Sequence, residues 1–230
     1  MMERPFYAQL HLHTSESSRC GRSTAAEMMR ACKDAGYSLV VVTDHFFNAN
    51  INCDFSLPWP QQVDCLMKGY WAAKAEGERL GLTVLFGWET NNGGPEVLTY
   101  GLGRDYLLAH PDIAQWPLEE YLARVKAAGG FCCHAHPFRE AYYIVPFQPQ
   151  PQLFEAFEVF NNHHAPENRI WDQKALAMAQ KYHLIQLAGC DAHRAQEVTG
   201  GAVKLPWPVS DMPGLIAALR SRKTEVIPHL

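Results

Sequence analysis

The chain has 230 residues, 47% of them hydrophobic and 19% charged, which fits one globular domain over residues 1–230 and excludes a disordered or collagen-like chain. The formal net charge is −4, so the chain lacks the basic excess with which nucleic-acid binders neutralise phosphates. Its longest apolar stretches, such as Leu39–Val42, are too short to cross a bilayer. We therefore expect a cytoplasmic protein without a membrane partner, and nucleic acid is disfavoured as a partner.

Short apolar runs alternate with helical segments along the chain. Phe6–Leu12 alternates apolar and polar side chains, as a half-buried strand does. Thr24 and Glu27 form a capping-box signature for a helix that runs to Ala35, where Gly36 ends it. The other expected elements are strands at Ser38–Val42, Leu82–Phe86, Val97–Tyr100, Phe131–Cys133, Phe157–Phe160, Leu184–Leu187 and Glu225–Ile227, and helices at Val63–Leu80, Leu118–Ala128, Ile170–Lys181 and Gly214–Ser221.

This alternation of strands and helices predicts an α/β fold with a mainly parallel sheet, either open or closed into a barrel. The irregular segments Asn48–Pro60 and Gln148–Gln152 are expected to be long loops. The seven cysteines are odd in number and contain no Cys-x-x-Cys pair, so they predict neither a disulfide framework nor a thiolate zinc site. We interpret them as reduced residues that act as small hydrophobes.

Ionisable side chains lie at the ends of five predicted strands. His11 and His13 are two residues apart in a strand and so point to the same face. The other four motifs are Thr43-Asp44-His45, Gly87-Trp88-Glu89, His134-Ala135-His136-Pro137 and Gly189-Cys190-Asp191-Ala192-His193. The carboxyl ends of parallel strands converge on one face of the sheet, where active sites form.

Each motif alone has an ordinary structural interpretation, such as a helix cap or a buried salt bridge. Five together at one face are different, because burying so many ionisable groups without a cation is costly. The motifs therefore predict a metal site. Its nitrogen and oxygen donors suit zinc, iron(II) and manganese alike.

Taken together, these motifs resemble those of a known family. His11-Leu12-His13-Thr14, Thr43-Asp44-His45, Glu89, His136-Pro137 and Asp191-Ala192-His193 are similar to the motifs of the polymerase and histidinol phosphatase (PHP) superfamily, in the same order and over nearly the whole chain. The resemblance is to stand-alone bacterial members of that superfamily. It implies a distorted seven-stranded (β/α)7 barrel, similar to a TIM barrel, with two or three divalent ions of zinc, iron or manganese and, in most cases, hydrolysis of phosphate esters.

The resemblance also assigns the metal ligands. His11, His13, Glu89 and Asp191 would hold a first ion, and Glu89 would bridge to a second ion that His136 also binds. His45 and His193 would hold a third. Relatives supply a further His or Asp to that third ion from the loop after His13, and here we predict Glu16 as its substitute. Relatives also use a second-ion histidine between Glu89 and His136, but His110 is expected at a helix end on the surface.

The remaining site predictions concern catalysis and substrate. Asp44, Asp191 and His193 are predicted as catalytic residues, with Asp44 orienting a ligand or transferring a proton. Arg139 offers a planar fork of donors to a phosphate group, although a surface salt bridge is its alternative role. His134 shares a strand face with His136 and is predicted to lie behind the ligands and line the substrate site.

Three function classes stay open at this level. The first is a phosphoesterase that uses a metal-bridging hydroxide to hydrolyse a small phosphomonoester such as histidinol phosphate or a nucleotide. The second is a nuclease or phosphodiesterase, and the third is a non-catalytic module braced by metals. A nearly intact ligand set favours an enzyme, and the absence of a basic excess favours a small phosphorylated substrate over a nucleic acid. The sequence does not identify the substrate or the oligomeric state.

Overall fold

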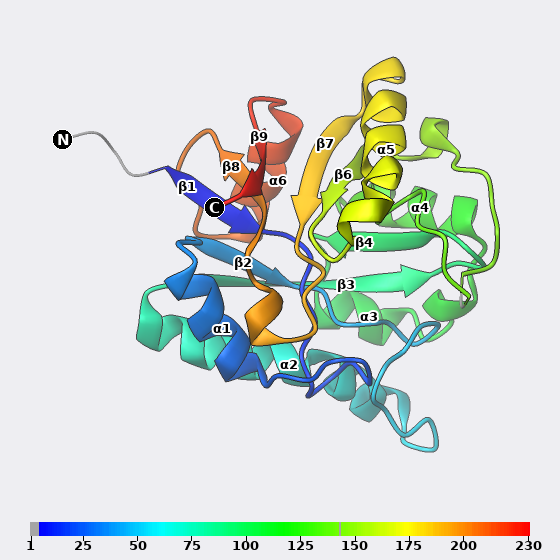
Figure 1. Cartoon of the computed structure of the whole chain (residues 1–230). Helices are drawn as coiled ribbons and strands as arrows, with labels where there is room; N and C mark the ends of the chain where they lie inside the picture. Colours follow the sequence, from blue (N-terminus) through cyan, green and yellow to red (C-terminus); the bar gives the residue numbers. More distant parts are fainter. Residues whose placement is uncertain (1–4, 143) are drawn as a thin grey trace.

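The computed structural model describes residues 5–142 and 144–230 (Figure 1). Its strands are β1 (Phe6–Gln9), β2 (Leu39–Val42), β3 (Thr83–Asn91), β4 (Glu96–Tyr100), β5 (Phe131–His134), β6 (Ala156–Asn161), β7 (Ile185–Gly189), β8 (Gly200–Leu205) and β9 (Glu225–His229). Its α-helices are α1 (Ala25–Asp34), α2 (Trp59–Leu80), α3 (Arg104–Ala109), α4 (Leu118–Ala127), α5 (Arg169–Lys181) and α6 (Met212–Arg220). Short 3₁₀ helices lie at Ile113–Gln115, Pro151–Leu153, Pro166–Asn168 and Ala195–Glu197.

The strands form one sheet in the order β7-β6-β5-β4-β3-β2-β1-β8-β9. Parallel pairs join β1 to β2, β2 to β3, β5 to β6 and β6 to β7, whereas β4 and β8 run antiparallel to their neighbours. A parallel bridge between Leu12 and Ala192 links the segment after β1 to the segment after β7, so the sheet is nearly closed into a barrel. The predicted α/β barrel class is confirmed, although the described sheet has nine strands instead of seven.

Most predicted elements are present with small changes in their bounds. Thr24 and Glu27 make the expected capping box at the start of α1, and Gly81 ends α2 in the left-handed region with φ 63°. The sequence pattern indicated only the end of α3, at His110, and missed β8, which opens on two glycines. β3 also continues beyond Phe86, because β4 pairs with its second half.

β2 shows how the core is divided between the two sides of the sheet. Leu39 and Val41 point into the barrel, where side chains from β4, β5, β7, β8 and α6 complete one hydrophobic cluster. Val40 and Val42 point outward and pack under α1 and α2, which lie side by side on that face in Figure 1. Burial on both faces explains why β2 is a continuous apolar run. None of the described helices is long and apolar enough to cross a membrane.

Two backbone positions at the rim of the barrel have unusual conformations. His136 has φ 27° and Asp191 has φ 50°, in the left-handed region that residues other than glycine seldom adopt. Both residues follow strands, β5 and β7, and both are among the predicted metal ligands. Such conformations persist where the surrounding structure fixes them, and they concentrate at functional sites.

Candidate metal centre

Two backbone bridges bring the predicted motifs together beyond the carboxyl ends of the strands. The Leu12–Ala192 bridge places the residues flanking Leu12 beside those flanking Ala192, with hydrogen bonds from Asp191 N to His11 O (2.8 Å) and from His13 N to Ala192 O (3.0 Å). A second parallel bridge joins His45 to Glu89. Side chains that flank a bridged residue share one face, so these motifs converge at one place.

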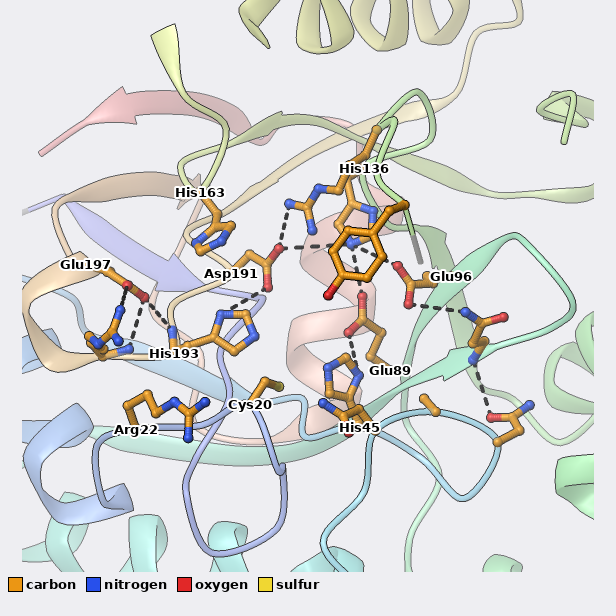
Figure 2. Close-up of a pocket in the computed structure, with 17 residues that line it drawn as sticks. Cys20, Arg22, His45, Glu89, Glu96, His136, His163, Asp191, His193 and Glu197 are labelled. Carbon is orange, nitrogen blue, oxygen red and sulfur yellow. Dashed lines mark hydrogen bonds and ion pairs between the residues drawn. The ribbon is translucent and has the colours of Figure 1, made fainter. Parts of the chain in front are cut away.

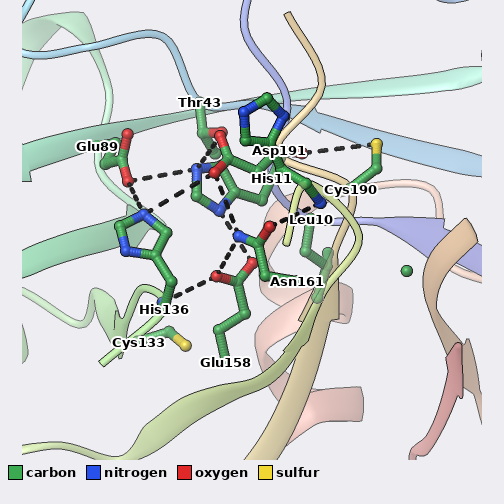
Figure 3. Close-up of polar contacts among 12 residues, drawn as sticks. Leu10, His11, Thr43, Glu89, Cys133, His136, Glu158, Asn161, Cys190 and Asp191 are labelled. Atoms are coloured by element: carbon green, nitrogen blue, oxygen red, sulfur yellow. Dashed lines mark hydrogen bonds and ion pairs between the residues drawn. The ribbon is translucent and has the colours of Figure 1, made fainter. Parts of the chain in front are cut away.

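Five buried side chains form what we call the inner cluster: His11, His13, Glu89, His136 and Asp191. Figure 3 labels all of them except His13. Glu89 Oε1 lies 3.1 Å from His136 Nε2 and 3.3 Å from His11 Nε2, while its Oε2 lies 3.4 Å from His13 Nε2. Asp191 Oδ1 lies 3.4 Å from His11 Nε2 and 3.2 Å from His13 Nε2. The exposed fraction of each of these side chains is 3% or less.

Three further side chains form the outer cluster: Cys20, His45 and His193 (Figure 2). His45 and His193 are 12% and 17% exposed. Their rings flank that of His13, with centroid distances of 4.4 and 4.6 Å, and the ligand nitrogens of the three histidines lie within 4.8 Å of one another. Burial opposes ionisation of the Cys20 thiol, but polar contacts with the rings of His193 and His45 outweigh it and lower its pKa to about 7.

The electrostatics of the inner cluster follow from its mixture of carboxylates and imidazoles. Burial alone would lower the pKa of His11, but the charges of Asp191, Glu158 and Glu89 outweigh it and raise that pKa well above its usual value. Burial would raise the pKa of Asp191, but His11 and Arg139 hold it well below its usual range. The cluster therefore keeps its carboxylates ionised, and positive charge stabilises it.

Glu158 and Asn161, both on β6, support the inner cluster, and sequence reasoning missed them. Glu158 Oε1 lies 2.9 Å from His11 Nδ1, and Oε2 accepts hydrogen bonds from His136 N and Asn161 Nδ2, both at 2.9 Å (Figure 3). Asn161 Nδ2 also donates to Asp191 Oδ2 at 3.2 Å. These contacts orient the Nε2 atom of His11 toward Glu89 and Asp191, as partners of metal-bound histidines do.

Glu16 does not join the outer cluster, so its prediction as a ligand needs correction. Both of its carboxylate oxygens accept from Ala25 N, at 3.0 Å each, at the first turn of α1. The N-terminal turn of a helix has backbone N–H groups without partners inside the helix, and a carboxylate satisfies them. Cys20, which the sequence analysis treated only as a small hydrophobe, faces the cluster instead.

The second-ion position lacks the histidine that relatives supply from between Glu89 and His136. His110 caps the end of α3, and its Nδ1 lies 2.7 Å from Tyr106 O, as the predicted helix end requires. Glu96, the first residue of β4, comes to the site in place of a histidine. Its Oε2 lies 3.6 Å from His136 Nε2, and Glu89, Glu96 and His136 together form a group with metal-ligand spacing.

Asp44 braces the loop that follows His13. Its Oδ1 accepts hydrogen bonds from Thr14 N (2.7 Å) and Ser18 Oγ (2.6 Å), and its Oδ2 accepts from Thr14 Oγ1 (2.7 Å). Ser18 Oγ in turn accepts from His45 N at 3.0 Å. Burial raises the pKa of Asp44 to about 6, against the effect of these hydrogen bonds. Asp44 is not among the cavity-lining residues, so the geometry fits an orienting role better than proton transfer to substrate.

The two predicted substrate residues have different surroundings. Arg139 lines the cavity, and it donates from Nη2 to Asp191 Oδ2 at 2.6 Å and from Nε to His164 Nε2 at 3.1 Å. His134 lies instead in an aromatic pocket, stacked on Phe154 and Phe147 with its edge toward Phe157. It is fully buried and outside the cavity lining, so its predicted substrate role needs correction. The strand face it shares with His136 ends at His134, because the chain turns sharply at His136.

A cavity of about 670 Å³ opens over both clusters (Figure 2). His45, Glu89, His136, Asp191 and His193 form its floor, and polar and cationic residues form its walls. The wall residues include Arg22, Arg139, Arg194, Asn48, Asn91, Glu96, Tyr142 and His163. A site of this size suits a small molecule.

The donor atoms fit divalent cations. Among the described residues, His45 and His193 each keep a buried Nδ1 atom without a hydrogen-bond partner, although His45 Nδ1 lies 3.1 Å from Glu89 Oε2. An unpartnered buried nitrogen beside a carboxylate is costly unless a cation takes its lone pair. Groups of imidazole and carboxylate donors at this spacing are typical ligands of zinc, iron and manganese.

Comparisons with known proteins agree with this picture. The model of the PHP-associated family matches residues 169–224. No curated protein sequence matches the chain. The fold is similar to that of a two-domain protein from Bacteroides vulgatus that contains a predicted PHP-like metal-dependent phosphoesterase, with a TM-score of 0.71 and 14% identity over 98% of this chain and 65% of that one.

Two other solved structures are similar over most of both chains. One is an inferred metal-dependent phosphoesterase from Bifidobacterium adolescentis, with a TM-score of 0.58 and 15% identity over 94% of this chain and 96% of that one. The other is an amidohydrolase from Chromobacterium violaceum with bound sulfate and no metal, with a TM-score of 0.57 and 16% identity over 96% and 97% of the two chains. The PHP-associated match and the PHP-like fold together confirm the resemblance to the PHP superfamily that the motifs indicate.

Proposed function

We propose that the chain is a metal-dependent phosphoesterase that acts on a small phosphomonoester. The observation that carries the proposal is the cavity itself, in which the imidazoles and carboxylates of the two clusters lie on the floor and three arginines lie on the walls. These arginines are Arg22, Arg139 and Arg194. Guanidinium groups match the geometry and the charge of phosphate oxygens.

His11, His13, Glu89 and Asp191 would hold a first ion, and Glu89, Glu96 and His136 a second. Divalent ions in these positions would supply an activated water at neutral pH and would offset the charge of the phosphoryl group. Glu158 keeps His11 in one orientation, and Asp44 keeps the loop after His13 in place. Arg139 fixes Asp191 through its Nη2 and faces the cavity, where it would orient a phosphate.

The leaving group would be an alcohol that takes its proton from water, and His193 would be a ligand of an outer ion together with His45. His193 lines the cavity next to Asp191, with 4.0 Å between Nδ1 and Oδ1. Burial would lower the pKa of His193, but polar contact with Cys20 and the charge of Asp191 raise it. A bound cation would displace the proton that these contacts favour, so the ring would bind it in its neutral form.

The test uses the full chain purified without chelator. Elemental analysis counts its metals, and a panel then compares p-nitrophenyl phosphate and nucleoside monophosphates with bis-p-nitrophenyl phosphate and an N-acyl amino acid. We expect phosphate release from monoesters that chelation abolishes and added zinc, iron(II) or manganese restores. Turnover of the diester alone would favour the nuclease alternative, and turnover of the amide alone would overturn the proposal. A metal-replete chain that hydrolyses none of these compounds would point to the metal-braced module.

A further inference from the structure

The outer cluster is one protein ligand short if only histidines are counted. His13 Nε2 is directed at the inner cluster, where it lies 3.3 Å from His11 Nε2 and 3.2 Å from Asp191 Oδ1. His13 also lies within ligand spacing of His45 and His193, but an inner ion that takes its Nε2 atom leaves only these two histidines for an outer ion. Protein zinc sites use at least three protein ligands, with a water or substrate in the fourth position when the site is catalytic.

The loop after His13 holds Cys20 in place beside these two histidines. Arg22 N donates to His193 O at 2.7 Å, which ties the loop to the segment that carries His193. Arg19 N donates to Asn50 O at 3.0 Å, which ties it to the segment that follows His45. Both anchors are backbone groups within two residues of Cys20. The side chain of Cys20 lies between those of His193 and His45 in Figure 2.

Buried ring nitrogens of the outer cluster give a second, independent indication of a cation. Within the described chain, the buried Nδ1 atom of His193 has no hydrogen-bond partner, and that of His45 faces the Glu89 carboxylate, with 3.1 Å between Nδ1 and Oε2. Glu16, the other donor that this loop offers, is held at the start of α1 by Ala25 N and does not reach them.

We propose that Cys20 is the third protein ligand of an outer metal ion, together with His45 and His193. This inference rests on the proposed function for the presence of the inner ions, but it concerns the outer ion alone. Binding converts the Cys20 thiol to a thiolate and releases its proton to solvent. A thiolate with two imidazoles favours zinc or cobalt(II) over manganese or magnesium, so the outer ion would differ in preference from the oxygen-richer inner ions.

The experiment loads the metal-free full chain with cobalt(II) and records its absorption and its metal content. The wild-type protein should show a near-ultraviolet sulfur-to-cobalt charge-transfer band and hold three ions. Cys20→Ser should lose the band and one ion while keeping two. Cys65→Ser, which removes a thiol from α2, and Glu16→Gln should both keep the band and all three ions. A band that survives in Cys20→Ser, or a wild-type protein with three ions and no band, would overturn the inference.

A second measurement does not depend on the folding of a variant. Iodoacetamide should alkylate Cys20 in the wild-type protein at least ~10-fold more slowly with zinc than without it, since a bound thiolate is shielded from the reagent. Peptide mass spectrometry reads the rate at Cys20 alone, and Cys65 provides the internal control. Equal rates at Cys20 would contradict the inference. Neither readout requires substrate, so a missing phosphoesterase activity with an intact cobalt–sulfur band would refute the proposed function and leave the Cys20 ligand in place.

Discussion

The inner and outer clusters differ in how the protein holds them. Three of the inner residues have partners outside the cluster: Glu158 contacts the His11 ring and the His136 backbone, and Arg139 and Asn161 contact the Asp191 carboxylate. The outer residues are more exposed, and the Nδ1 atom of His193 has no hydrogen-bond partner within the described chain. A site oriented by such contacts is ready before its ions arrive, whereas an outer ion would itself fix the histidines that bind it. We therefore expect the inner ions to bind tightly and the outer ion to exchange.

Glu89→Gln should impair both clusters, because the Glu89 carboxylate contacts both. Its carboxylate contacts His11 and His136 on one side and His45 on the other. We expect loss of at least one ion and a fall in kcat/KM of about 10³-fold or more. Removal of one preorganised electrostatic group from an active site has an effect of up to about that size. Elemental analysis and steady-state kinetics measure both effects, with circular dichroism as the control for folding. Full metal content with near-normal turnover would refute the bridging position of Glu89.

Glu158→Gln should weaken the inner cluster alone. A glutamine in this position must place its NH₂ group either against His11 Nδ1 or against both donors, His136 N and Asn161 Nδ2, that bind Glu158 Oε2. Loss of such a supporting partner typically costs about 10- to 100-fold in metal affinity. Competition with a chelator measures the inner affinity, and the cobalt–sulfur band reports on the outer ion in the same sample. An equal loss at both positions would mean that the two clusters are not separately supported.

His134→Phe tests whether His134 lies outside the site, because this side chain lines neither the cavity nor the metal-ligand clusters. Burial, with a smaller effect of His136, lowers the pKa of His134 to about 3, from about 6.5 in an unfolded chain. The unfolded state thus binds the extra proton, and wild-type stability falls as the pH drops from about 6.5 toward 3. At pH 5 this titration lowers the free energy of unfolding of the wild type by about 2 kcal/mol. The phenylalanine variant has no group to protonate at this position and keeps that stability.

Urea denaturation of the metal-free proteins at pH 7 and pH 5 measures this difference between His134→Phe and the wild type. The two chains carry the same other histidines, so the difference between their pH dependences reports on the residue at position 134. Metal content and turnover should stay normal in the variant. An identical pH dependence of the two proteins, or a loss of metal from the variant, would show that His134 belongs to the site after all.

Much of the site could be predicted because its signals are local. His11 and His13 share a strand face whatever the rest of the chain does, and Asp191 and His193 repeat that spacing. The capping box at Thr24 is equally local, and the structure contains it.

The remaining features depend on long-range contacts. In the sequence, Glu158 is one acidic residue in an apolar strand. Only the pairing of β6 with β5 and β7 shows that its side chain points at His11. Glu16 and Cys20 lie four residues apart in one loop, and the direction of each side chain is set by distant partners, Ala25 for Glu16 and the anchored backbone around Cys20. No local pattern in the sequence distinguishes them.

The reversed direction of β4 has a consequence for how this cavity could diversify in evolution. Because β4 runs antiparallel to β3, its beginning lies at the catalytic rim, and the short turn at 92–95 separates Asn91 from Glu96. Insertions in that turn would reshape one wall of the cavity while leaving the histidines on the other strands unmoved. A change in this single hairpin would therefore alter which substrates fit while the metal ligands stay in place.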